Sequence, residues 1–162
     1  MEGADRLFPK RRIRSKTPFE YALRVLARRD FFETEMRAKI AEHFGDEAAE
    51  ETILKLKDYG YIDDEKCRKN LIASRLRSGY GRYRIVEELR EKGIDADLTD
   101  MDEIAGERSI DTKAQLAEMV KRFMETKKAK TPYELKQKCI AHFYRKGYSF
   151  NEIVDILDSD NN

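Results

Sequence analysis

Four arginines and a tyrosine surround a short glycine loop near the middle of the chain: Arg75, Arg77, Tyr80, Arg82 and Arg84. Guanidinium groups bind phosphate oxygens independently of base sequence, and an exposed tyrosine can stack on a base. Residues 65–92 hold nine Lys/Arg against four Asp/Glu, a local charge of +5. The pattern predicts contact with an anionic partner. The alternative is that Arg75 and Arg84 pair with acids of neighbouring repeats of the chain while Tyr80 and Tyr83 pack.

A second basic segment lies near the C-terminus, where residues 121–146 hold nine Lys/Arg against two acids. Its predicted partner-binding residues are Lys121, Arg122, Lys127, Lys128 and Lys130, and the alternative is a solvated pair of helices. Residues 1–16 add a third basic segment, predicted to be a disordered arm. Its cations, Lys10, Arg11, Arg12 and Arg14, either bind nucleic acid after ordering or serve only solubility.

No group of side chains combines an acid, a base and a nucleophile, so no catalytic residue is predicted. Asp63, Asp64 and Glu65 are consecutive, and neighbouring side chains on a helix point about 100° apart. We therefore expect them to start a helix, where acids suit the positive end of the dipole, rather than to bind a metal. His43 and His142 lack ligand-spaced partners and are expected in the core or at an interface. The sequence predicts neither enzyme activity, metal nor cofactor.

The composition favours slender helices with narrow apolar stripes, since 40% of the 162 residues are charged and 40% hydrophobic. No apolar run approaches the roughly 18 residues that a membrane span needs. Cys67 and Cys139 are expected to be buried free thiols in a reducing cytosol, with a disulfide as the alternative. These features predict a cytoplasmic protein with no membrane partner.

Capping patterns mark the starts of several helices. Thr17 and Thr131 each precede a proline and stand three residues before a glutamate, and Ser149 stands three before Glu152. Asp46 is expected to cap a further helix. Other helices are expected over 33–44, 63–78, 83–92, after 95 and over 112–128. Leu54 and Tyr144 are placed on the buried stripes of their helices.

A recurring unit organises these helices. A helix ended by glycine is followed by a shorter helix at Gly45, Gly93 and Gly147, in steps of 48 and 54 residues. This spacing predicts an all-α fold, an elongated array of three tandem three-helix repeats. The expected boundaries are a basic arm over 1–16, repeats over 17–62, 63–108 and 109–158, and a short tail over 159–162.

Several runs resemble the RecX family of bacterial regulators. The similarity is most specific in Tyr59-Gly60-Tyr61-Ile62-Asp63-Asp64-Glu65 and Arg75-Leu76-Arg77-Ser78-Gly79-Tyr80-Gly81, and it continues through Lys92-Gly93-Ile94. The segments Ala22–Arg29 and Glu35–Ile40 resemble the start of the family, and Arg145-Lys146-Gly147-Tyr148-Ser149 the close of its third repeat. The chain departs from the pattern at Phe32, where a serine cap is usual, and at Cys67-Arg68.

The resemblance implies a non-enzymatic modulator of the RecA recombinase. Such proteins bind the RecA–single-stranded-DNA filament in its groove and depress its ATPase, strand-exchange and coprotease activities, which regulates DNA repair, recombination and the SOS response. The implied partners are the RecA filament and, weakly or through the filament, single-stranded DNA. A monomer is expected.

Two other classes stay open on the residues alone. A stand-alone helical nucleic-acid-binding module, such as a transcription regulator, is compatible with short helices and basic loops. It would bind duplex DNA by sequence without RecA. A pure protein–protein scaffold would show no salt-sensitive affinity for nucleic acid.

Overall fold

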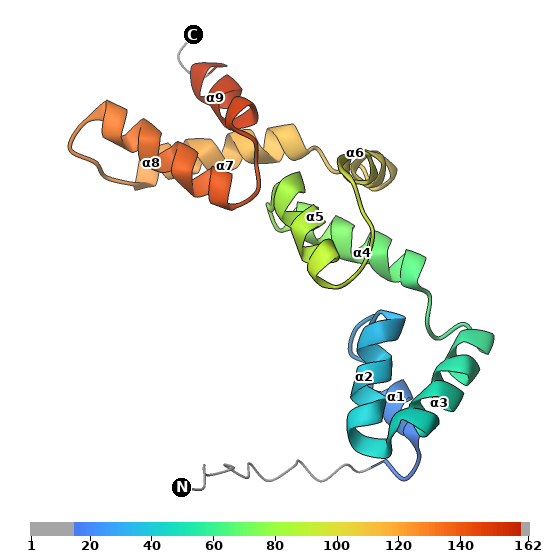
Figure 1. The fold of residues 1–162 in the computed structure, drawn as a ribbon. Helices are drawn as coiled ribbons and strands as arrows, with labels where there is room; N and C mark the ends of the chain where they lie inside the picture. Colours follow the sequence, from blue (N-terminus) through green and yellow to red (C-terminus); the bar gives the residue numbers. More distant parts are fainter. Residues whose placement is uncertain (1–14, 160–162) are drawn as a thin grey trace, which may run out of the picture. The chain divides into compact units, whose positions relative to one another are not determined.

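The computed structural model describes residues 15–159, and all regular structure within them is α-helical (Figure 1). The helices are α1 Pro18–Leu26, α2 Glu33–Phe44, α3 Asp46–Asp58, α4 Asp64–Arg77, α5 Arg82–Glu91, α6 Leu98–Glu107, α7 Thr112–Thr126, α8 Pro132–Arg145 and α9 Phe150–Ser159. The predicted all-α class is confirmed. No helix of the described residues is long and apolar enough to cross a membrane. The arm residues Lys10, Arg11, Arg12 and Arg14 lie outside the described part of the chain.

The contacts divide the chain into two compact units, with the boundary between Cys67 and Arg68, inside α4. The first unit contains α1, α2, α3 and the first turn of α4. The second contains the rest of α4 and the helices α5 to α9. The expected boundaries of the three repeats stay a prediction.

The first unit packs its three helices around one apolar cluster: Ala22, Phe31, Met36, Ile40, Ala49, Ile53, Leu56 and Ile62. The predicted cap at Thr17 is confirmed, because the Glu20 backbone N–H donates to Thr17 Oγ1 at 3.2 Å. Two details differ from expectation. The N-cap of α3 is Gly45 rather than Asp46, which is the first helical residue. Leu54 is 63% exposed, because it lies next to the buried stripe rather than on it.

The acidic run 63–65 serves two helix starts. The Lys66 backbone N–H donates to Asp63 Oδ1 at 3.0 Å, which caps α4. The Glu33 backbone N–H donates to Asp64 Oδ1 at 2.7 Å, at the start of α2. Phe32 holds the N-cap position of α2 and has no side chain that could accept this bond. Asp64 thus supplies from a distant position an acceptor for one of the N–H groups that the first turn of α2 leaves without a helical partner. The interpretation of these acids as helix-start residues is confirmed.

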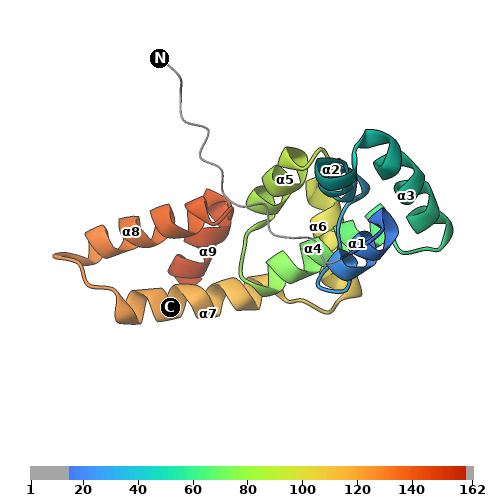
Figure 2. The same cartoon turned by 90° about the horizontal axis from the view of Figure 1, so that it is seen from below.

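The second unit contains a core formed by α7, α8 and α9, which lie against one another (Figure 2). Its buried residues are Leu116, Val120, Cys139, Phe143, Tyr148, Ile153, Ile156 and Leu157. The Glu134 N–H donates to Thr131 Oγ1 at 3.1 Å and the Glu152 N–H to Ser149 Oγ at 3.2 Å, which confirms both predicted caps. Cys67 and Cys139 are free and buried in their respective units, as expected.

Candidate functional site

The glycine loop between α4 and α5 is held against the turn between α8 and α9. The Gly81 N–H donates to the Lys146 carbonyl oxygen at 2.8 Å, and the Tyr83 N–H donates to the Gly147 carbonyl oxygen at 3.1 Å. A Cβ atom on Gly81 would overlap the Gly147 carbonyl group, and one on Gly147 would overlap Arg84. Only glycine allows two backbones to approach this closely. This contact places the predicted loop residues beside the last helices of the unit (Figures 1 and 2).

Arg75 on α4 is paired with a carboxylate of the next helix, α5. Its Nε and Nη2 atoms donate to the two carboxylate oxygens of Glu88, both at 2.7 Å. The hydrogen bonds from Arg75 lower the pKa of Glu88. The guanidinium carbon of Arg75 lies 5.8 Å from the centre of the Tyr80 ring, and Lys146 Nζ lies 6.0 Å from it. Two cations thus flank the Tyr80 ring, and the side chain is 38% exposed, so part of the ring is open to solvent.

Arg82 and Arg84 also have carboxylate partners. Arg82 bridges two helices, with Nη1 3.2 Å from Asp102 on α6 and Nη2 3.4 Å from Glu152 on α9. Arg84 pairs with Glu87 one turn further along α5, at 3.2 Å. Such partly exposed pairs contribute about 0–1 kcal/mol, so a stronger anion can compete for them. Arg75 and Arg84 thus pair with acids of α5, within residues 63–108, and not with acids of a neighbouring repeat as the alternative had it. Partner contact by these residues stays a prediction.

Arg77 differs from the other loop arginines. Its backbone carbonyl accepts a hydrogen bond from Gln115 Nε2 at 2.8 Å, which fixes the end of α4 against α7. Its side chain is exposed, and within residues 15–159 no carboxylate pairs with its guanidinium. Of the four predicted loop cations, Arg77 is the most available to a partner.

The second predicted surface is more open than the first. Lys121, Arg122, Lys127, Lys128 and Lys130 are all exposed. Arg122 lies 4.0 Å from Glu118, while the lysine side chains of this set have no carboxylate partner among the described residues. The last three belong to the five-residue connection between α7 and α8, which carries no acid. Unpaired ammonium groups in this arrangement suit a phosphate backbone.

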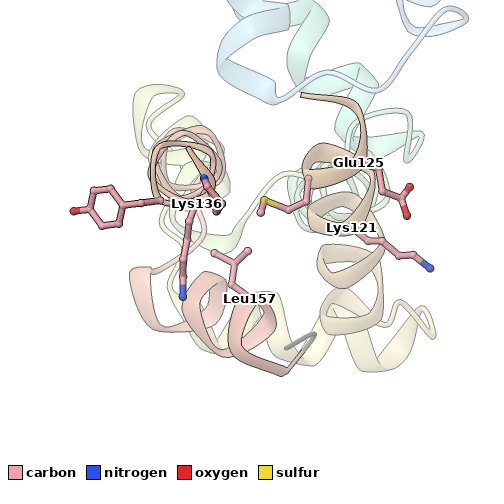
Figure 3. A pocket seen from close by; sticks show the side chains of 7 residues that line it. Lys121, Glu125, Lys136 and Leu157 are labelled. Atoms are coloured by element: carbon pink, nitrogen blue, oxygen red, sulfur yellow. The ribbon is translucent and has the colours of Figure 1, made fainter. Parts of the chain in front are cut away.

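Two neighbouring lysines are already paired. Lys136 Nζ lies 2.8 Å from Asp158, and Lys138 Nζ lies 2.8 Å from Glu134. Lys136 borders an open cleft of about 470 Å³ whose floor includes Leu157. In Figure 3, Leu157 lies between α7 and α8, and Lys121 points away from it. The Lys121 ammonium group is thus directed outward rather than into the cleft.

The buried titratable groups are poor candidates for chemistry. Burial raises the pKa of the Cys67 and Cys139 thiols to about 11, so both are protonated at neutral pH. Burial lowers the pKa of His142, and its ring packs 4.9 Å from the Phe143 ring. His43 lies edge-on to the Tyr21 ring at 5.2 Å. These contacts agree with the expected packing role of both histidines.

Sequence reasoning missed several residues of this region. Tyr144 was expected inside but is 64% exposed, because it lies at the edge of the α8 stripe. It borders a groove with Tyr83 and Phe150. Glu88 and Glu152 were not singled out as partners of the loop arginines. Their charge indicated a place on the helix surface, but the sequence does not show which cation each acid meets.

The helices define an all-α protein of the helical-repeat class, with basic side chains exposed on its surface. Residues 63–101 match the model of the second three-helix domain of RecX, and residues 112–157 match the model of its third three-helix domain. The chain belongs to the RecX family.

Similar proteins cover most of the chain. It is 30% identical over 146 residues to the regulatory protein RecX of Haemophilus influenzae (strain PittEE), covering 88% of this chain and 94% of that protein. It is 37% identical over 89 residues to the regulatory protein RecX of Stenotrophomonas maltophilia (strain R551-3), covering 54% and 55%. The crystal structure of RecX from Lactobacillus salivarius has the same fold, with a TM-score of 0.69 at 17% identity, covering 88% of this chain and 93% of that one.

Proposed function

We propose that this chain is a non-enzymatic regulator that binds the RecA–single-stranded-DNA filament and lowers its ATPase, recombinase and coprotease activities. Membership of the RecX family is the observation that carries this proposal, since the relatives are named regulatory proteins. By this route the chain regulates DNA repair as a monomer, with weak affinity for single-stranded DNA outside the filament.

The charge distribution supports contact with a filament that presents both protein and phosphate. The net charge of the chain is only +1, so a strong general affinity for polyanions is not expected. The connection between α7 and α8 nevertheless carries Lys127, Lys128 and Lys130 without carboxylate partners in the described part of the chain. Local phosphate contact can then add to a protein contact without holding the chain on free DNA.

The direct test is a titration of RecA-coated single-stranded DNA with the purified chain, in which the rate of ATP hydrolysis is measured at each step. We expect hydrolysis to fall as the chain approaches stoichiometry with the filament. Unchanged hydrolysis together with no binding to the filament would refute the proposal. Sequence-dependent binding to duplex DNA in the absence of RecA would instead support a transcription regulator.

Two charge variants test the lysine connection. Lys127→Glu/Lys128→Glu should weaken filament binding and reduce the salt dependence of the affinity. Lys55→Glu/Lys113→Glu changes the charge equally at two exposed lysines outside both predicted surfaces and is the matched control. Equal binding by the two variants would exclude the lysine connection as a specific contact.

Among the loop arginines, Arg77 and Arg82 give different information. Arg77→Glu removes a cation with no carboxylate partner within residues 15–159, so it should weaken filament binding without loss of stability. Arg82→Glu also breaks the bridge to Asp102 and Glu152 and should destabilise the second unit. If Arg77→Glu binds normally, the loop is not a main contact.

A further inference from the structure

The second unit has an open groove between α5 and the α8–α9 turn, with a volume of about 1250 Å³. Three aromatic side chains on its walls are exposed: Tyr83 by 50%, Tyr144 by 64% and Phe150 by 55%. Single exposed rings are ordinary on a protein surface, but several in one groove indicate an interaction site. The contact between Gly81 and Gly147 fixes the two walls relative to each other, so the groove is preformed.

The charge of the groove does not suit a nucleic acid. Its lining carries three cations and three acids, namely Arg84, Arg90, Arg145, Glu87, Glu91 and Asp97. Grooves that bind single-stranded nucleic acid combine aromatic rings with a clear excess of positive charge. Aromatic residues and arginine without such an excess are typical of protein–protein interfaces. The lysine connection between α7 and α8, which has no acid, is the better phosphate site.

Some of these charges are already satisfied within the unit. Arg84 pairs with Glu87 at 3.2 Å. The Asp97 carboxylate accepts the N–H groups of Thr99 and Asp100, at 2.7 and 3.1 Å, where it caps α6. These groups are therefore already engaged within the unit.

Two guanidinium groups beside the rings stay open. Arg145 uses Nε for the Ala141 carbonyl at 3.2 Å and has no carboxylate partner among the described residues. Arg90 also lacks a carboxylate partner there. Against them stands the exposed Glu91. Asp97 keeps its negative charge in its hydrogen bonds, so the lining is neutral overall. Arg90 and Arg145 are its open donors, and they suit a carboxylate beside an apolar side chain.

We propose that this groove binds a polypeptide segment that inserts an apolar side chain between the three rings and presents carboxylates to Arg90 and Arg145. This inference rests on the proposed function and assigns the groove to the protein subunit of the filament, while the lysine connection contacts the DNA phosphates. Insertion of an anchor side chain into a fixed, aromatic-lined groove is the usual source of affinity in a protein interface.

The test compares binding to two probes, a RecA filament on oligo-dT and the oligo-dT alone. Tyr144→Ala/Phe150→Ala should weaken filament binding about ten-fold or more and should change the affinity for the oligonucleotide alone by less than about two-fold. Tyr133→Ala is the matched control, because Tyr133 lies on the same helix as Tyr144, is 73% exposed and does not line the groove. It should change neither affinity.

A photo-crosslinking amino acid at position 144 provides a second measurement that does not depend on removing contacts. It should join the chain to the RecA subunit and not to the oligonucleotide. Unchanged filament affinity in the double variant, or crosslinking to DNA, would overturn the groove assignment while leaving the proposed function intact. Absence of filament binding by the unaltered chain would overturn both.

Discussion

Replacing Gly81 with alanine should separate the α4–α5 loop from the α8–α9 turn. Gly81 has φ −77° and ψ 157°, a conformation that alanine adopts without strain. The added Cβ would nevertheless overlap the carbonyl group of Gly147 and the backbone nitrogen of Tyr148. These are backbone atoms that no change of rotamer can move away. The loop must therefore shift, and the variant isolates the effect of close approach from the effect of backbone conformation.

The expected cost follows from the contacts that the shift disturbs. It would lengthen the bonds from Gly81 N–H to Lys146 and from Tyr83 N–H to Gly147, now 2.8 and 3.1 Å. Each such bond contributes about 0.5–1.5 kcal/mol net, and an overpacked site costs about 1–3 kcal/mol. A larger movement of the loop relieves the overlap but lengthens both hydrogen bonds, so one cost falls as the other rises. We expect the free energy of unfolding of the second unit to fall by about 2–4 kcal/mol.

Urea unfolding followed by circular dichroism, with hydrogen exchange of amides 68–159, measures this loss and locates it. Gly93→Ala is one control, because Gly93 has φ +74° with nothing within 4 Å of an added Cβ, so it should cost only about 1 kcal/mol of strain. Gly106→Ala is the other, because this helical glycine has open space and alanine should be neutral or stabilising. Equal costs for Gly81→Ala and Gly93→Ala, with an unchanged exchange rate at the Tyr83 amide, would refute the reasoning.

Three further predictions concern other contacts. Asp64→Ala should lower the free energy of unfolding of the first unit by about 1 kcal/mol, because the Glu33 N–H at the start of α2 loses its acceptor. Urea unfolding measures this loss, and an unchanged free energy would contradict the role of Asp64. The lowered pKa of Glu88 means that its pair with Arg75 contributes fully at neutral pH and is lost as pH falls below the ordinary carboxyl range. Arg75→Met should therefore flatten the acid limb of the stability curve, and an unchanged limb would contradict this. Cys67 and Cys139, with pKa values of about 11, should react with a thiol reagent only as fast as the chain opens, and rapid labelling of the native chain would contradict their burial.

The helices could be predicted from the sequence where the deciding contacts are local. Thr131 and Ser149 cap their helices through bonds to residues three positions away, so the pattern is visible in a short window. The α2 cap could not be predicted in this way, because its acceptor Asp64 lies 31 residues from Glu33. Tyr144 is a similar case. It lies at the edge of the apolar stripe, so its exposure depends on how α5 and α9 pack, and the helical period does not describe that packing.

The same limit applies to the glycines that marked the repeats. Gly45, Gly93 and Gly147 all have positive φ at a helix end, which is the shared local cause of the repeating pattern. An added Cβ would meet open space at Gly45 and Gly93, but Arg84 and the Gly81 carbonyl at Gly147. Glycines at corresponding positions of the repeating pattern thus have different roles, and of these three only Gly147 packs its turn against another loop. The loop cations and the aromatic groove both depend on this contact, because it places α5 beside the α8–α9 turn. The position of the loop arginines beside the groove therefore derives from the close approach of Gly81 and Gly147, and their contact with a partner stays a proposal.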